Sequence, residues 1–133
     1  MCRVQCLPIV ICMRADSPSA EEAEGVVADE DKKRAAHRAL VDRILSGEGK
    51  APADQRARAF RNDGLAAPLD ALIAKVADDP TQVTEQDLAA AKASGCTEDH
   101  LFELVVCAAV GEATRQYEAG LAALAEATGQ GEV

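Results

Sequence analysis

The chain has 133 residues and a formal net charge of −9 at neutral pH. This acidity disfavours nucleic acid as a partner, because phosphate binding requires clustered lysine and arginine. No apolar run approaches the roughly 18 residues of a membrane-spanning helix, so we expect one soluble domain that does not enter a membrane.

The hydrophobic residues are mostly small. They make up 48% of the chain, but only 2% of residues are aromatic, and alanine occurs 28 times. Alanine-rich helices pack closely but bury little area each. At roughly 25 cal/mol per Å² such a core is marginal for a lone chain. The composition therefore predicts a homo-oligomer.

The five cysteines are Cys2, Cys6, Cys12, Cys96 and Cys107, and their odd number and uneven spacing do not suggest a disulfide framework. We expect a reducing, cytoplasmic location. The first three cysteines lack the fourth ligand and the spacing of common zinc sites, so no metal site is predicted.

An N-terminal extension is expected over residues 1–31. Residues 1–13 contain a short apolar stretch at the lower edge of a signal-peptide core. Alternatively, Met13 is the biological start, or the segment is an inert extension. Residues 15–31 are acidic, with serine, proline and glycine, which predicts a mobile lead-in.

Helical periodicity begins at Asp31. Apolar residues then share one face until Gly47 ends the helix: Ala36, Leu40, Val41, Ile44 and Leu45. A second short helix is predicted over 53–62, stopped by Gly64. Pro68 suits the first turn of a third helix, which the sequence Asp78-Asp79-Pro80 ends.

Two threonines mark the start of the last two helices. Thr84 is the expected N-cap of a short helix, with Asp87 in the matching capping-box position and Gly95 at the end. Thr97 is the expected N-cap of a helix over 98–127. Cys96 precedes this cap and would pack against Leu101 as a hydrophobic staple.

The last helix is apolar on all sides over residues 104–110, which predicts a core or a subunit interface there. It would be roughly 45 Å long, so its distal end can clasp a neighbour. We divide the chain into the extension at 1–31, a helical domain at 32–128 and a tail at 129–133.

The run from Thr84 to Leu124, with Gly95-Cys96-Thr97 joining a short helix to a long alanine-rich helix, resembles the carboxymuconolactone decarboxylase and alkylhydroperoxidase D-like superfamily. The resemblance extends over about residues 40–127. It implies an all-α fold, a small orthogonal bundle of about five to six helices, and assembly as a homotrimer or hexamer.

The thiol-redox branch of this superfamily carries the motif Cys-x-x-Cys-x-x-x-His before the glycine. Its cysteines would fall near Thr81 and Thr84, and its histidine near Asp87 or Leu88, so the redox pair is missing. A threonine hydroxyl supplies neither a thiolate nor a disulfide. The resemblance therefore implies a degenerate active site.

Four residues are candidates for a catalytic role. Asp87 lies near the position of the histidine that the resemblance implies and can act as an acid or base, although a helix cap is its simpler role. Arg115 and Tyr117 can line a pocket where the long helix becomes polar; alternatively, Arg115 pairs with Glu112. Cys96 lies near a helix N-terminus, which favours a thiolate, but its staple role competes.

The remaining reactive side chains are expected to be structural. Cys107 has apolar neighbours and should be a buried, inert thiol, and His37 and His100 should be surface or capping residues. No phosphate loop or Ser-His-Asp arrangement occurs, and no cofactor is predicted.

The sequence thus predicts a carboxymuconolactone decarboxylase-like protein without the thiol-redox centre, acting as an oligomeric accessory or assembly module, with room for a second protein as partner. One alternative is a non-thiol enzyme of the decarboxylase or lactone type acting on a small carboxylated substrate. Another is weak residual peroxidase activity through Cys96. Whether the protein is an enzyme stays open.

Overall fold

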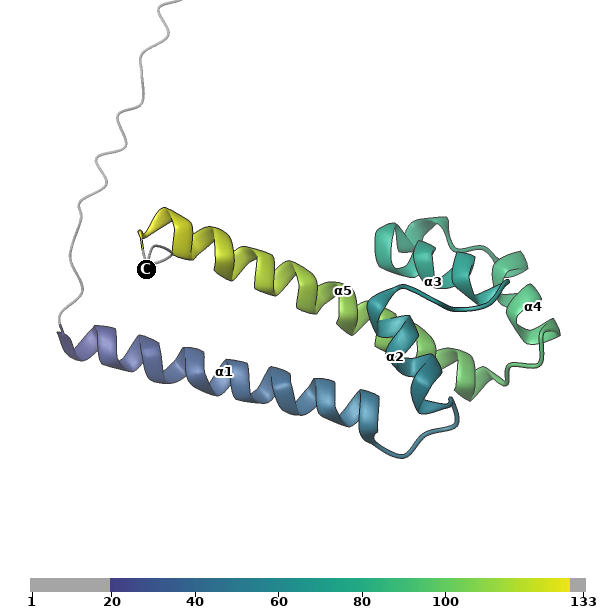
Figure 1. The fold of residues 1–133 in the computed structure, drawn as a ribbon, viewed down its shortest axis with the longest axis horizontal. Coiled ribbons are helices and arrows are strands. Elements are labelled where there is room, and N and C mark those ends of the chain that lie inside the picture. Colours follow the sequence, from purple (N-terminus) through teal and green to yellow (C-terminus); the bar gives the residue numbers. More distant parts are fainter. Residues whose placement is uncertain (1–19, 130–133) are drawn as a thin grey trace, which may run out of the picture. The chain divides into compact units, whose positions relative to one another are not determined.

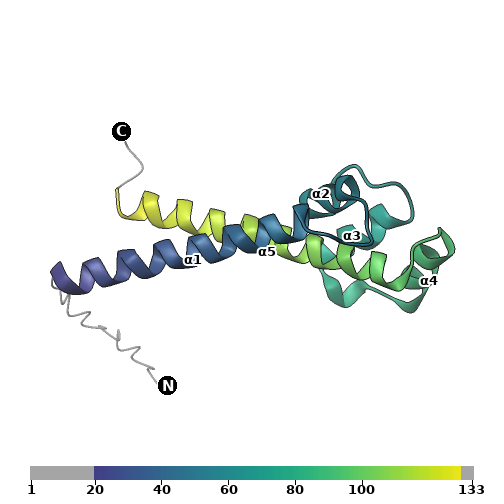
Figure 2. The ribbon, with the colours of Figure 1, turned by 90° about the horizontal axis from the view of Figure 1, so that it is seen from below.

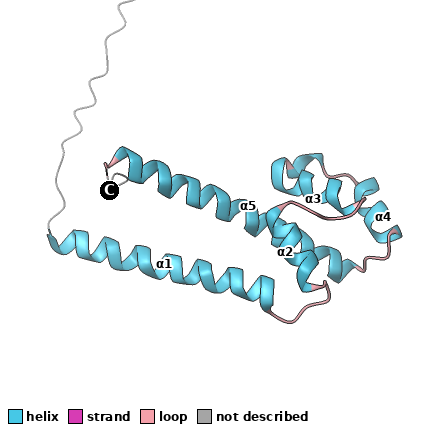
Figure 3. Cartoon of the chain, in the orientation of Figure 1, coloured by secondary structure: helices cyan, strands magenta, loops and turns pink. Residues whose placement is uncertain are grey.

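The computed structural model describes residues 20–129, which contain helices and loops and no strand (Figure 3). This confirms the all-α prediction. The elements are α1 Ala20–Ser46, α2 Ala53–Arg61, α3 Leu69–Asp78, the 3-10 turn η1 Pro80–Gln82, α4 Glu85–Ala93 and α5 Glu98–Ala127. No helix in this part of the chain is long and apolar enough to cross a membrane.

The chain divides into two compact units, residues 1–35 and 36–133. In the first unit the helix prediction is wrong at its start, because α1 begins at Ala20 and not at Asp31. Alanine and glutamate favour a helix there, and Lys33 contacts Asp29 at 2.9 Å and Glu30 at 3.5 Å, one turn earlier.

Several predictions concern segments outside the described residues. They include the signal-peptide and start-site alternatives for residues 1–13, the metal and redox assignments of Cys2, Cys6 and Cys12, and the end of the tail at 130–133. All of them stay predictions.

In the second unit, α2, α3 and α4 gather around the N-terminal half of α5, and the C-terminal half of α5 continues beyond them (Figure 1; Figure 2). Four of the ten core residues are alanines, so the core is as thin as the composition predicts. The core cluster comprises Ala51, Ala59, Leu69, Leu72, Ile73, Ala91, Leu101, Leu104, Cys107 and Ala108.

The predicted apolar face of α1 is only partly used. Ile44 packs against the core cluster, whereas Leu40 is 44% exposed. On α5 the stretch 104–110 behaves similarly. Its residues Leu104, Cys107 and Ala108 are buried, while the intervening valines are half-buried and Ala109 is exposed.

Helices α2 and α5 approach each other closely at Gly111. A β-carbon at Gly111 would lie 2.8 Å from the carbonyl carbon of Phe60 and would collide with its oxygen. Only glycine therefore permits this approach. Helix α2 ends at Arg61, and its C-cap residue Asn62 takes the left-handed conformation with φ 53°.

The predicted caps are present. The Thr84 side chain accepts a hydrogen bond from the backbone of Asp87, and that of Thr97 accepts one from His100. Gly95, with φ +105°, follows α4. Pro68 differs slightly from its prediction, because it precedes the first residue of α3 instead of lying in its first turn.

Candidate functional site

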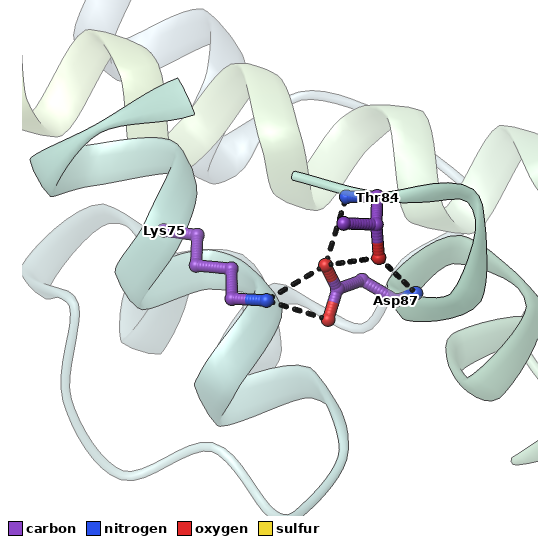
Figure 4. A network of polar contacts seen from close by, with 3 residues as sticks. All are labelled: Lys75, Thr84 and Asp87. Atoms are coloured by element: carbon purple, nitrogen blue, oxygen red, sulfur yellow. Dashed lines mark hydrogen bonds and ion pairs between the residues drawn. The ribbon is translucent and has the colours of Figure 1, made fainter. Parts of the chain in front are cut away.

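Asp87 belongs to a polar network between α3 and α4 (Figure 4). Its carboxylate accepts hydrogen bonds from Lys75 Nζ at 2.9 and 2.8 Å, from Thr84 N at 2.8 Å and from Thr84 Oγ1 at 2.9 Å. The capping box expected from the sequence is therefore complete. The ion pair with Lys75, twelve residues earlier, was not expected.

The same contacts define the acidity of Asp87. The hydrogen bond from Lys75, supported by the bonds from Thr84, lowers the pKa of Asp87 to about 2. A general base works best when its pKa lies near the working pH. The geometry thus suits a structural carboxylate that stays ionised, and the proposed acid–base role of Asp87 gains no support.

Arg115 connects α5 with the end of α2. Its Nε and Nη2 donate to Glu112 Oε2 at 3.1 and 2.9 Å, which is the pair expected from the sequence. In addition, Nη1 donates to the carbonyl oxygen of Phe60 at 2.8 Å. The guanidinium is therefore engaged on two sides and braces the α2–α5 crossing.

Tyr117 lies beside His37, with ring centroids 5.6 Å apart, and its buried hydroxyl has no hydrogen-bond partner among the described residues. His37 Nε2 is 3.0 Å from Thr114 Oγ1, which donates its own hydrogen to Val110 O at 2.7 Å. His37 Nε2 must therefore donate to Thr114. His37 is thus a half-buried structural residue and not a surface one.

The catalytic candidates do not form one site. In the described part of the chain, no hydrogen bond or ion pair joins Asp87 to Arg115 or Tyr117. His100 also has a contact that the sequence did not predict, because its Nε2 lies 2.7 Å from Gln55 Oε1 on α2.

The two described cysteines are free and occupy different environments. Cys96 is half-buried and packs against the core cluster that contains Leu101, which agrees with the staple prediction. Cys107 is 1% exposed, and burial raises the pKa of its thiol. The prediction that Cys107 is buried is confirmed.

A cavity of about 540 Å³ lies between the end of α1, the start of α2 and α5. Four of its residues are charged: Arg43, Glu48, Arg56 and Glu103. Its size falls within the range of small-molecule pockets, which is about 300–1,000 Å³. Sequence analysis did not identify this cavity.

Arg56 is the buried charge of the cavity. It is 7% exposed, and its Nη1 donates to the carbonyl oxygen of Ile44 at 2.9 Å. Its Nε is buried without a partner, and it forms no ion pair with any described residue. In the sequence, the burial of Arg56 is indicated only by its spacing of three residues from Ala59, which places both on one face of the helix.

Glu103 holds the loop that closes the cavity. Its two oxygens accept hydrogen bonds from the backbone N–H groups of Lys50 and Ala51, both at 2.7 Å. These bonds lower the pKa of Glu103. Gly49 lies so close that a β-carbon there would be 2.6 Å from Glu103 Oε2. The carboxylate is thus hydrogen-bonded to the loop, and the nearby charge of Arg56 lowers its pKa further without a direct ion pair.

No family model, curated protein or solved structure matches this chain. Within residues 20–129, no group of three or more histidine, cysteine, aspartate or glutamate side chains is placed to hold a metal ion.

Proposed function

We propose that this protein is a homo-oligomeric assembly module of the carboxymuconolactone decarboxylase and alkylhydroperoxidase D-like type, without a thiol-redox centre. The observation that carries the proposal is an exposed apolar groove between α4 and α5. Phe102 is 68% exposed there, although the chain has only two phenylalanines.

The groove has a volume of about 220 Å³, and it reaches from the surface to the core residue Leu101. Leu101, a buried core residue, lines it, together with the exposed Leu88 and Phe102 and the half-buried Val105. Large exposed aromatic side chains beside a groove are typical anchors of protein interfaces. Covering this groove would add the apolar burial that a small alanine-rich domain lacks.

Charges at the rim of the groove favour a second copy of the same chain as the occupant. Lys92 Nζ lies 2.6 Å from Glu98 Oε1, so a cation and an anion stand side by side. A two-fold related copy presents the same pair in reverse order, and each charge then meets its opposite. Such a contact gives a dimer or contributes to a hexamer.

The enzymatic alternatives draw less support from the geometry. Asp87 is fully engaged by Lys75 and Thr84, and Arg115 is engaged by Glu112 and Phe60. Residual peroxidase chemistry through Cys96 would need a reactive, accessible thiol, whereas Cys96 packs against the core.

The proposal is tested by the mass of the assembly in sedimentation velocity and native mass spectrometry. We expect the wild-type chain to be an even-numbered oligomer, and Phe102→Asp to break it into smaller species with unchanged helix content. Leu124→Asp is the matched control, because Leu124 is 60% exposed on the same helix outside the groove.

Four results would contradict the proposal. They are a monomeric wild-type chain, an odd-numbered oligomer such as a homotrimer, an oligomer that Phe102→Asp leaves intact, and an oligomer that only Leu124→Asp disrupts. The last result would place the interface on the distal half of α5.

A further inference from the structure

Arg56 and Arg115 make the same main-chain contact but differ in what lies on the other side of the guanidinium. In both residues Nη1 donates to the carbonyl oxygen of a neighbouring element, Ile44 for Arg56 and Phe60 for Arg115. Arg115 uses the adjoining edge, Nε and Nη2, to bind the carboxylate of Glu112. The corresponding edge of Arg56 has no carboxylate partner among the described residues.

This difference has an energetic cost. A guanidinium keeps its charge at any pH relevant to proteins, and burying it without an anionic partner is strongly unfavourable. The side chain of Arg56 is more than nine-tenths buried. The nearest candidate anion, Glu103, is held by the backbone of Lys50 and Ala51. A bound anion would offset the cost.

The unpaired edge of the Arg56 guanidinium indicates an anionic ligand. Nε is shielded from solvent, so the adjacent Nη2 is the donor that a carboxylate oxygen in the cavity can reach. Phosphate fits the same edge, but Glu48 and Glu103 also line the cavity and would repel a multiply charged anion. With Arg43 the four charges sum to zero, so the preference for a single negative charge comes from Arg56 and not from the cavity as a whole.

The rest of the cavity indicates an apolar body for the ligand. Ile44, Val106 and Phe102 line the wall, and the neutral thiol of Cys107 lies among them. Hydrocarbon placed against this wall is removed from water, which strengthens binding in proportion to the area buried.

We propose that the cavity between α1, α2 and α5 binds a small organic monocarboxylate, whose carboxylate pairs with Arg56 and whose apolar body lies against Val106 and Phe102. The site is separate from the capping network at Asp87. Phe102 also lines the groove proposed for assembly, so the two proposals share one wall residue, and titration of a ligand and the mass of the oligomer test them separately.

The test is isothermal titration calorimetry of the full chain with benzoate and hexanoate as probes. Benzamide and hexanamide have the same shapes without the charge, and inorganic phosphate tests the competing anion class. We expect both acids to bind at least about tenfold more tightly than their amides and than phosphate, since losing one charged contact costs that much or more.

Two variants locate the site. Arg56→Met should fold, because replacing a buried charge by an apolar side chain of similar size is often neutral or stabilising, and it should weaken benzoate binding at least about tenfold. Val106→Trp fills the cavity and should block binding while Arg56 is intact. Arg61→Met is the control on the same helix, because Arg61 is exposed and does not line the cavity; it should bind as the wild type does.

Several results would overturn the inference: no heat with either acid, equal affinity for acid and amide, tighter binding of phosphate, or full benzoate affinity in Arg56→Met. These outcomes are distinct from those of the assembly test, because the mass of the oligomer does not enter the titration.

Discussion

Gly111 of α5 lies directly against the carbonyl group of Phe60 in α2, and the same carbonyl oxygen accepts a hydrogen bond from Arg115, one turn further along α5. A single peptide group thus receives both a close backbone contact and a hydrogen bond from a charged donor. This contact holds the crossing of the two helices that bury Ala59 and Ala108 in the core.

Gly111→Ala should destabilise the protein by about 2 kcal/mol or more. Alanine is the better helix former by about 1 kcal/mol, but its β-carbon would force α2 and α5 apart, and overpacking of this kind costs about 1–3 kcal/mol or more. The measurement is urea unfolding followed by circular dichroism. Gly120→Ala is the control, since a β-carbon there meets nothing within 4 Å, and it should stabilise the chain. The same change in the free energy of unfolding in Gly111→Ala and Gly120→Ala would contradict the prediction.

The network at Asp87 predicts a pH dependence. The pKa of Asp87 is lowered to about 2 in the folded protein, against roughly 4 in an unfolded chain. Its contribution to stability is therefore present above about pH 4 and is lost as the pH falls towards about 2. In thermal unfolding scans across this window, the wild type should lose stability more steeply than Asp87→Asn. Asp78→Asn, an exposed residue of α3, should keep the wild-type slope.

Thr84→Ala removes the hydroxyl from the same network and should cost about 1 kcal/mol, the typical contribution of an N-cap. Thr97→Ala, which loses the hydroxyl that accepts from His100 N at 3.2 Å, should cost a similar amount. Equilibrium unfolding in urea measures both losses. Exposed Thr81 provides the comparison, because its hydroxyl donates to Asp79, the N-cap of η1, but caps no α-helix; a Thr81→Ala loss as large as the other two would contradict the assignment.

Glu103→Gln should destabilise the loop between α1 and α2 by about 1–3 kcal/mol. It keeps the shape of the side chain, but its single amide oxygen can accept from only one of Lys50 N and Ala51 N, so one charge-assisted hydrogen bond is lost and the other is weakened. Guanidinium unfolding reports the loss, and Glu85→Gln on the exposed surface of α4 is the control. The folded pKa of Glu103 is lowered, so its contribution is present above the unfolded pKa and disappears as the pH falls through the folded one.

The cysteines should differ in their reaction with iodoacetamide. Cys107 is buried and its pKa is raised, so its native alkylation should be at least about tenfold slower than that of half-buried Cys96. Peptide mass spectrometry after timed labelling separates the two sites. Comparable rates in the folded protein would show that the cavity around Cys107 opens far more freely than its burial suggests.

Local interactions explain what the sequence could predict. The caps at Thr84 and Thr97 and the bounds of α5 depend on residues within one turn, so side-chain chemistry and spacing identify them. The Glu112–Arg115 pair is recognisable for the same reason. The start of α1 was missed because an acidic composition was given more weight than the helix propensity of alanine and glutamate.

The contacts that build the candidate sites join residues distant in the sequence, and periodicity carries no information about them. Lys75 meets Asp87 because α3 and α4 lie side by side, and Arg56 meets the end of α1 only after the chain has turned. The cavity follows from the same packing, so its ligand chemistry became visible only with the fold.

The second half of α5 has a consequence for hydrogen exchange. The helix is packed by α2, α3 and α4 along its first half, whereas most side chains of residues 118–127 are exposed. Amide protons near Leu104 should therefore exchange only on global unfolding, and those near Leu124 by local fraying from the helix end. The protection boundary along one continuous helix would then mark how far the cooperative folding unit extends.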